Sequence, residues 1–517
     1  MPSPFRIPVL LAGTALLSAC SVSNDYANFD RPAPPVTATL PSGGDYAPLP
    51  DVAETGLPWR QWIRDPRLLQ LAEAALVDNR DLATSVAQID VARAQYRIQR
   101  SAQLPTIAAG AGATFTDSGT ARFGGSSSVD VGDSGSGVPS GFSSGGGGVT
   151  ESYSVDAGVS DFELDLFGRV RSQSRAALER YLSTVEGARS ARIALVAELA
   201  SAWATHAADA ELLKISEDTL ASANRSIDLV TKLKDAGLIS ALDLVSLQDL
   251  AAAARADIAA RRSQLLQDRN AIHLLVGRPV DPALFPSSLA DADGALAAVP
   301  VALSSEVLLA RPDVVAAERE LKATNADVDA ARAAFFPRIS LTAALGLASA
   351  ALGDLFTGGA FNWTVAPSAT LPIFGGPTRG NLDLAKAQRQ LALAQYEGAI
   401  QTAFRDVADA LARRGTIDEQ LAANRDRVAA AQRGVRLSDA RYRAGLDNYL
   451  ATLTAQRTLY TARQAAAAAQ LEALANNVAV YRAIGNDGMA DAPASVTPQR
   501  PVPSLVEPQE APSLSGR

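Results

Sequence analysis

The stretch FPRISLTAALGLAS, residues 336–349, decides the fold. Pro337 cannot continue the Ala-rich helix expected over about 312–335, and it favours extended geometry in the residue before it. Beyond Pro337 the apolar side chains occupy every second position, at Ile339, Leu341, Ala343, Leu345 and Leu347. A period of two over this length predicts a β-strand with one apolar face.

The same pattern occurs earlier in the chain. Leu104-Pro105 precedes another alternating segment, 232 residues before Phe336-Pro337. Two further matches lie at offsets of 207 and 208 residues: Leu166-Phe-Gly168 with Ile373-Phe-Gly375, and Asp235-Ala-Gly-Leu238 with Arg443-Ala-Gly-Leu446. The offsets differ because the first half contains a Gly/Ser-rich stretch, 118–149, which we interpret as a loop. The chain is therefore interpreted as two copies of one helix-strand-helix plan.

We expect the two repeats to share one order of elements. The first, 66–277, begins with a helix at about 66–103 and continues with strands at about 105–116 and 151–166 and long helices at about 168–235 and 241–276. The second, 312–485, has strands at about 337–349 and 362–373 and long helices at about 379–443 and 448–484. Residues 20–65 form an N-terminal segment, residues 278–311 connect the two repeats, and the Pro-rich segment 486–517 is interpreted as a disordered tail. A helix over 168–235 would reach ~100 Å, far longer than a globular core requires.

Residues 1–19 have the organisation of a secretory signal peptide, in which Arg6 precedes an apolar run. The junction Leu17-Ser-Ala-Cys20 resembles the bacterial lipobox, whose cysteine becomes the first mature residue and carries acyl chains. Cys20 is also the only cysteine, so no intrachain disulfide can form. Ser21 follows where an Asp would resemble the inner-membrane retention signal, so we expect the outer membrane. The alternative is an ordinary signal peptide followed by a stray thiol.

Composition and hydropathy restrict the class of protein. A net charge of −8 and a pI of about 5.1 offer no general basic surface for nucleic acid. No segment after the signal peptide has the ~18 uninterrupted apolar residues of a membrane helix, so the mature chain would cross a membrane as strands. Four strands cannot close a barrel and open edges are not tolerated in lipid, so copies must assemble, three of them giving twelve strands. The alternative, a soluble β-sandwich, explains neither the lipobox nor the long helices.

Several motifs occur in a specific order: Trp59-Arg-Gln-Trp62 with Asp65-Pro66, Phe336-Pro337, Leu371-Pro-Ile-Phe-Gly375, and Arg441-Tyr-Arg-Ala-Gly-Leu446 with Asp447-Asn-Tyr-Leu450. In this order they resemble the TolC-type outer membrane factors, and particularly the lipidated NodT-type branch, over nearly all of the mature chain. The resemblance implies an α+β membrane protein. It would be a homotrimer whose 12-stranded outer-membrane β-barrel, with four strands per chain, continues into a 12-helix periplasmic α-barrel. The acylated N-terminal segment 20–65 and the connector 278–311 would contribute to an equatorial domain around this α-barrel.

The resemblance also implies partners and functional residues at the helix turns. Gly237, Leu238, Gly445 and Leu446 would form tips that contact a periplasmic adaptor, which links the channel to an inner-membrane pump of the RND type. Both glycines would also end their helices as C-caps. A periplasmic gate is implied at Asp243, Arg441, Tyr442 and Asp447. In a symmetric trimer, the three copies of Asp243 would form a ring of carboxylates that favours cations.

Each acidic gate residue has a structural alternative. Ser240 and Asp243 have the spacing of an acidic capping box, and Asp447 is suited to the N-cap of the following helix. Thr454 occupies the second-repeat position where relatives often have Asp. This chain therefore departs from the double carboxylate ring of those relatives.

The sequence shows no constellation of catalytic residues. His206 and His273 lie in predicted helices without acidic or thiol groups at metal-ligand spacing. We expect no enzyme activity, and no cofactor apart from the covalent lipid on Cys20. The predicted function is a passive exit channel of a tripartite efflux pump that conducts small molecules across the outer membrane. The alternatives are the outer-membrane channel of a type I protein secretion system and a structural lipoprotein that spans the periplasm.

Overall fold

The computed structural model describes residues 25–27, 29–49, 56–117, 149–235, 241–357 and 359–485, which form two compact units. The first unit comprises 1–38, 79–192 and 308–405, and the second 39–78, 193–307 and 406–517. Several predicted features lie outside the described residues: the signal peptide 1–19, Cys20, residues 118–148 of the loop predicted at 118–149, the turn 236–240 with Gly237 and Leu238, and the tail 486–517. Val149, the last residue of the predicted loop, begins a strand instead.

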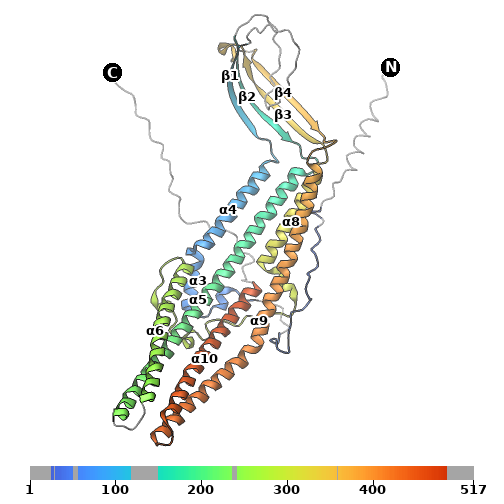
Figure 1. Cartoon of the computed structure of the whole chain (residues 1–517). Coiled ribbons are helices and arrows are strands. Elements are labelled where there is room, and N and C mark those ends of the chain that lie inside the picture. The colour runs from blue at the N-terminus through green and yellow to red at the C-terminus, as the bar shows by residue number, and fades with distance from the viewer. Residues whose placement is uncertain are drawn as a thin grey trace, which may run out of the picture. The chain divides into compact units, whose positions relative to one another are not determined.

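The first unit contains one four-stranded antiparallel sheet (Figure 1). Its strands follow chain order: β1 (Ile107–Asp117), β2 (Val149–Glu163), β3 (Arg338–Ser349) and β4 (Phe361–Thr370). Val155 pairs with Leu347, and Leu345 pairs with Trp363. Since directly opposite residues share a face, the apolar alternation predicted from the sequence produces one continuous apolar face. β1 and β4 are the two edges of this sheet.

Two strands end earlier than predicted. The strands expected at 151–166 and 362–373 end at Glu163 and Thr370. Pro372 has no N–H to donate to a ladder. Asp165 instead accepts hydrogen bonds from the backbone N–H groups of Val170 (3.2 Å) and Arg171 (2.8 Å) at the start of the next helix. The residues after each strand therefore form a turn that leads into a helix. The first N–H groups of a helix have no acceptor within it and need acceptors such as the Asp165 carboxylate.

Helices enter and leave both hairpins of the sheet. α4 (Arg80–Ser101) and α8 (Pro312–Ala333) precede β1 and β3, while α5 (Arg169–Asp235) and α9 (Thr378–Arg443) follow β2 and β4. The single helix predicted at 66–103 is wrong, because it is divided into α3 (Pro66–Asp78) and α4. Asn79 between them is extended, with ψ of 129°, and its side chain accepts the Leu82 N–H at 2.8 Å as an N-cap. The Asn side chain thus interrupts an otherwise Ala-rich helical pattern.

The second unit packs the long hairpins against short elements. It contains α2 (Trp59–Trp62), α3, α6 (Ala241–Val276), α7 (Leu289–Ala292), α10 (Tyr449–Ile484) and the later parts of α5 and α9. Among the residues that the structure describes, 3-10 turns occupy Pro282–Leu284, Ser305–Ala310 and Leu352–Asp354. Trp62 is fully buried, its ring stacks on Tyr481 with centroids 4.0 Å apart, and its carbonyl accepts the Ala297 N–H at 2.7 Å. The Trp59–Trp62 motif is therefore part of the core of this unit.

In α5, Leu213, Leu220 and Ile227 recur every seven residues, and a second row of smaller residues follows each of them by three positions. The row of smaller residues is buried. Ser216, Ala223 and Val230, spaced seven residues apart, are all at most 1% exposed, while Leu220 and Ile227 pack beside them. Small residues at a seam allow helices to approach closely. In the described part of the chain, none of the helices combines the length and the apolar character that a membrane crossing needs.

Candidate functional site at the helix tips

The turn between α9 and α10 is closed by a glycine cap. Gly445 has φ of 71°, in the left-handed region, and its N–H donates to the Tyr442 carbonyl at 2.9 Å. The Leu446 N–H donates to the Arg441 carbonyl at 3.0 Å. This pair of bonds satisfies the last carbonyls of α9 and confirms Gly445 as its C-cap. It leaves the Leu446 side chain 67% exposed at the tip.

A charged pair spans the same turn. Arg441 donates to both carboxylate oxygens of Asp447, from Nε at 2.5 Å and from Nη2 at 3.0 Å. These hydrogen bonds lower the pKa of Asp447, and the positive charge of Arg441 adds to the effect. The alternative reading of Asp447 as an N-cap is wrong, because the N-cap position of α10 is Asn448, whose side chain makes no capping bond. The Asp447 carboxylate instead pairs with Arg441, whose planar guanidinium can donate to both carboxylate oxygens.

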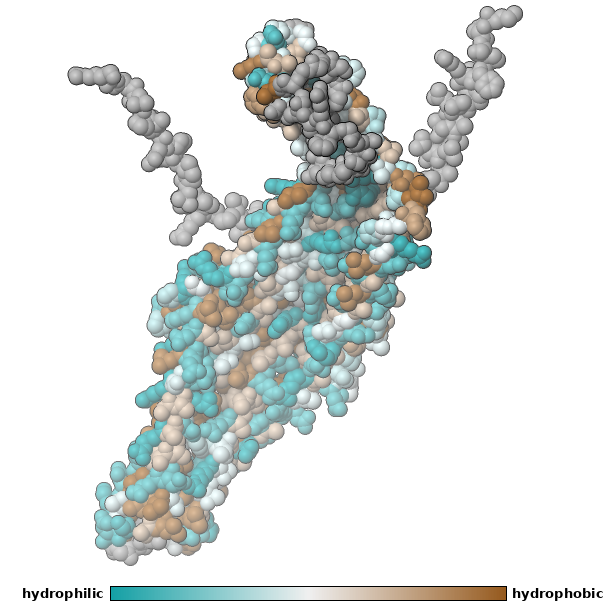
Figure 2. Space-filling view, turned by 45° about the horizontal axis from the view of Figure 1, so that its top comes forward, coloured by the Kyte–Doolittle hydropathy of each residue, from teal (hydrophilic) through white to brown (hydrophobic). Residues whose placement is uncertain are grey.

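An aromatic pair lies behind the ion pair. Tyr442 meets Tyr449 edge to face, with centroids 5.0 Å apart and ring planes at 78°. Tyr449 is buried in a cluster with Ala223 and Val230 of α5, Leu247, Leu250 and Ala251 of α6, and Leu453 of α10. Figure 2 shows brown, hydrophobic side chains gathered among hydrophilic ones at this end of the second unit. The tips of both helical hairpins are thus joined by one apolar cluster.

Asp243 lies at the start of α6, in its first turn and partly exposed. Burial, and then the negative charge of Asp243, raise the pKa of Tyr442. The start of α6 and the end of α9 are therefore close enough to interact electrostatically. Ser240 lies outside the described residues, so the capping box of α6 remains a prediction. The Thr454 hydroxyl is exposed and donates to the Leu450 carbonyl of its own helix at 2.8 Å.

Sequence reasoning missed two contributors to the tips. Tyr449 belongs to the motif Asp447–Leu450, but the sequence assigns it no role at the tips, although it lies seven residues after Tyr442 across the turn. Arg457 of α10 donates from Nη2 to Asp249 of α6 at 2.7 Å, and the two residues are separated by 208 positions. This separation equals the offset of the repeats, so Asp249 and Arg457 occupy equivalent positions in the two repeats.

A second cluster of contacts fixes the segment that follows Cys20. The backbone N–H groups of Asp25 and Tyr26 both donate to the Asp329 carboxylate at 2.9 Å. The Asp25 carboxylate in turn accepts from Arg332 at 2.7 Å and from Arg389 at 3.2 Å. Burial raises the pKa of Asp329, although the two backbone donors oppose the shift. Because Asp329 lies near the end of α8, this segment is attached close to the start of β3.

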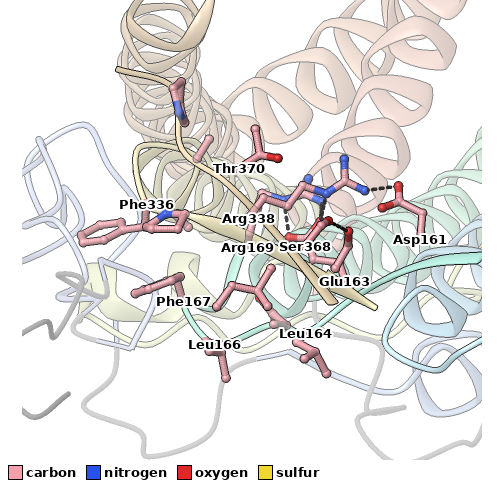
Figure 3. A pocket seen from close by; sticks show the side chains of 17 residues that line it. Asp161, Glu163, Leu164, Leu166, Phe167, Arg169, Phe336, Arg338, Ser368 and Thr370 are labelled. Atoms are coloured by element: carbon pink, nitrogen blue, oxygen red, sulfur yellow. Dashed lines mark hydrogen bonds and ion pairs between the residues drawn. The ribbon is translucent and has the colours of Figure 1, made fainter. Parts of the chain in front are cut away.

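The junction between strands and helices in the first unit surrounds a cavity of about 470 Å³ (Figure 3). Arg338 at the start of β3 donates to Asp161 at 2.7 Å and pairs with Glu163 at 3.0 Å. Arg169 pairs with Glu163 from the other side. Asp161 has φ of 50° at a bulge between Val159 and Phe162. The bulge gives β2 an extra residue whose carboxylate faces Arg338.

The histidines lie in a different environment. The His206 ring lies 5.0 Å from the Phe285 ring, and burial, followed by the charge of Arg269, lowers the pKa of His206. The described residues include no group of three or more His, Cys, Asp and Glu side chains that could hold a metal ion.

Comparisons with known proteins agree with this geometry. The sequence profile of the family described as "Outer membrane efflux protein" matches residues 71–278 and 303–486. The chain is 42% identical to the antibiotic efflux pump outer membrane protein ArpC of Pseudomonas putida, over 94% of this chain and 98% of that protein. It shows the same identity and coverage with a toluene efflux pump outer membrane protein, TtgC, also of Pseudomonas putida.

Solved structures show the same fold. The open state of the MtrE outer membrane channel of Neisseria gonorrhoeae matches with a TM-score of 0.76 and 34% identity, over 89% of this chain and 97% of that chain. The predicted α+β class with four strands per chain, in a TolC-like outer-membrane channel fold, is confirmed. The family is one of outer-membrane channel proteins rather than enzymes. The chain therefore belongs to the outer membrane efflux protein family and is the outer-membrane exit channel of an efflux pump, reaching from that membrane into the periplasm.

Proposed function

We propose that three copies of this chain form one lipid-anchored duct with twelve strands and twelve long helices. The duct is closed at its periplasmic tips and opens when a periplasmic adaptor docks there. Small molecules enter it from an inner-membrane pump of the RND type, which spends the energy. The duct itself is passive, because the adaptor only has to favour the open arrangement of the tips over the closed one.

The contacts at the helix tips carry the proposal. The bidentate pair of Arg441 and Asp447 and the ring pair of Tyr442 and Tyr449 hold the α9–α10 turn in one arrangement. The Tyr442 hydroxyl is buried and has no hydrogen-bond partner among the described residues. A buried polar group of this kind is costly unless another group satisfies it. In a closed trimer, a neighbouring copy would supply a hydrogen-bond partner for the Tyr442 hydroxyl, close to Asp243.

The proposed lipid anchor fits the position of the segment that follows it. Cys20 precedes Asp25 by five residues, and five residues of extended chain span at most about 18 Å, so an acyl anchor on Cys20 would be tethered near a point fixed to α8. Asp329, which holds this point, is nine residues before the first residue of β3. Acyl chains on Cys20 would therefore enter the membrane beside the strands. A single acyl chain binds a membrane only weakly, and the strands would supply the second attachment.

The cargo class follows from the relatives. Two proteins that are 42% identical over nearly their whole length are named for the efflux of antibiotics and of toluene. We therefore assign small, largely apolar molecules to this chain in preference to secreted proteins. A spacer lipoprotein would have no use for a gated tip.

Efflux measured in cells that lack their own outer-membrane component tests the proposal. With the cognate pump and adaptor co-expressed, the wild-type chain is expected to restore tolerance to toluene and antibiotics. Leu446→Glu should abolish tolerance while trimers persist, because it places a charge on the exposed docking tip. Val77→Glu is the matched control, since Val77 is 80% exposed on α3 and away from the tips. Equal tolerance of the two variants would contradict docking at the tip.

Metabolic labelling with palmitate tests the anchor separately. The wild-type chain should incorporate label, and Cys20→Ala should not. Label that persists in Cys20→Ala would contradict acylation at this residue, since the chain has no other cysteine.

A further inference from the structure

The two faces of the four-stranded sheet differ in character. One face carries the large apolar side chains, among them Val155, Leu345 and Trp363. The alternate positions belong to the opposite, polar face and carry Gly, Ala, Ser, Thr and Asn, together with a few charged side chains. Strands of an outer-membrane channel alternate between an apolar side toward lipid and a polar side toward the lumen. The polar face of this sheet is therefore the one that lines the path of the cargo.

Near the strand ends, the charged groups of the polar face neutralise one another (Figure 3). Arg338 pairs with Asp161 and with Glu163, and Arg169 at the start of α5 pairs with Glu163 as well. Two arginines thus meet two carboxylates, and this cluster adds no net charge. Asp156, farther along β2, is the remaining charged residue of the polar face within the described strands. Its carboxylate therefore sets the sign of the charge on this face.

The Asp156 carboxylate is open to its surroundings. The side chain is exposed, and among the described residues its carboxylate has no ion-pair or hydrogen-bond partner. Both residues directly opposite Asp156 are glycines, Gly110 on β1 and Gly346 on β3. A Cβ atom at Gly110 would lie 3.8 Å from both carboxylate oxygens, and one at Gly346 would lie 2.5 Å from the Val155 carbonyl oxygen. The close approach of the strands thus requires glycine at Gly346, and neither neighbour has a side chain that covers the carboxylate.

We infer that the three copies of Asp156 form a carboxylate ring inside the strand region of the channel and make this region selective for cations. The cargo that the ring favours is a protonated or quaternary amine with an apolar body, in preference to an anion of the same size. The inference rests on the proposed trimer and narrows its cargo of small, largely apolar molecules to the cationic ones. The ring is separate from the proposed gate, because Asp156 belongs to the first unit and Asp243 to the second.

The dimensions of a twelve-stranded barrel determine how strongly the ring acts. Strands about 4.8 Å apart and tilted by about 40° close to a radius of about 12 Å, which places the three carboxylates about 10 Å from the axis. The Debye length is about 10 Å at 0.1 M salt and about 3 Å at 1 M, so the ring reaches an ion on the axis only at the lower concentration. Coulomb attraction through water at this distance gives a preference for cations over anions of about fourfold near 0.1 M and almost none near 1 M.

Reversal potentials of the full-length trimer in planar bilayers test the ring. The parent channel carries Asp243→Ala and Arg441→Ala, so that the proposed ring of Asp243 at the tips is absent. In a KCl gradient centred on about 0.1 M the parent should prefer K⁺ over Cl⁻, and Asp156→Asn should lower the permeability ratio about fourfold. In a gradient centred on about 1 M the same substitution should leave the ratio nearly unchanged.

Moving the charge along one row of the sheet separates electrostatics from structure. Gly346 lies directly opposite Asp156 on one side and Asn362 on the other, so Asp156 and Asn362 lie in the same row of the polar face. Adding Asn362→Asp to Asp156→Asn returns the charge to this row and should restore at least half of the lost selectivity. Glu151→Gln is the matched control, because Glu151 lies on β2 opposite Phe115, on the apolar face. It removes the same charge and should leave the ratio unchanged.

The outcomes separate the ring from the channel. Equal ratios for the parent and Asp156→Asn in conducting trimers would overturn the ring and leave the proposed channel intact. A lowered ratio that Asn362→Asp does not restore would assign Asp156 a structural role and would also overturn the ring. An equal loss of selectivity in Glu151→Gln would overturn the assignment of the polar face to the lumen. Monomers by native mass spectrometry would instead contradict the proposed trimer.

Discussion

Replacing Tyr449 with alanine should loosen the helix tips selectively. Tyr449 is 3% exposed, meets Tyr442 edge to face and lies in the apolar cluster at the ends of α5, α6 and α10. Removing a buried aromatic ring costs about 3–5 kcal/mol, because transfer free energy is lost and a cavity remains. At 1.4 kcal/mol per factor of ten, even the lower figure makes local opening ~100 times more frequent.

Hydrogen–deuterium exchange of the assembled protein measures this opening directly, because exchange at protected amides follows local opening. Amides of 442–453 should exchange about 100-fold faster in Tyr449→Ala, while amides of the first unit keep their wild-type rates. Tyr449→Phe keeps the ring and should change exchange by about fivefold or less, since only a hydroxyl is lost. Thr454→Ala is the matched control on the same helix, because the Thr454 side chain is exposed and bonds only to its own backbone. Equal exchange in Tyr449→Ala and Thr454→Ala would refute the aromatic cluster as the element that holds the tip.

Two further predictions concern the second unit. Trp62→Ala should lower the thermal unfolding midpoint sharply, since removing a fully buried ring that stacks on Tyr481 costs about 3–5 kcal/mol. Trp62→Phe keeps the stack and should recover more than half of the lost midpoint. Equal midpoints for the two variants would contradict the role of stacking. Arg67 hydrogen bonds lower the pKa of Asp291 to about 2, so the pair stabilises the fold above about pH 4 and loses that stability as the pH falls through 2. Because both side chains are partly exposed, Asp291→Asn should lower the free energy of unfolding by about 1 kcal/mol near neutral pH and not at all near pH 2. Denaturant unfolding at each pH measures this difference between the wild-type protein and the variant. A difference that is the same at both pH values would exclude the ion pair as its cause.

The long elements could be predicted from the sequence because local signals determine them. Alternation after Pro337 specifies the strand and its apolar face, and long stretches without proline specify the helices. Gly445 ends α9 at the residue that the sequence indicates, since few other residues adopt its backbone conformation readily. The start of α6 at Ala241 and its end at Val276 agree with the predicted bounds of 241–276.

The sequence-based predictions are wrong at residues whose side chains can bond to either of two nearby groups. Asn79 caps a new helix instead of continuing the old one, which the surrounding alanines conceal. Asp447 has the local context of an N-cap, yet its carboxylate pairs with Arg441 across the turn. In both cases the two alternative bonds use the same side-chain atoms, and a pattern of residue types does not show which bond forms.

The attachment of the N-terminal segment could not be predicted at all. Asp25 and Asp329 are 304 residues apart, and neither belongs to a periodic pattern or a motif. Two carboxylates meet there only because backbone N–H groups and the arginines Arg332 and Arg389 surround them. Such a contact follows from the packing of the helices, which sequence periodicity describes only in outline.

Single-channel conductance of the purified protein in planar bilayers tests the central claim, a duct closed at its tips, most directly. The wild-type protein should insert as a trimer and conduct poorly. Asp243→Ala combined with Arg441→Ala should raise the conductance several-fold, because it removes the proposed carboxylate ring and releases Asp447 from its partner. The same conductance in the wild-type protein and in the double variant would contradict a gate at these residues.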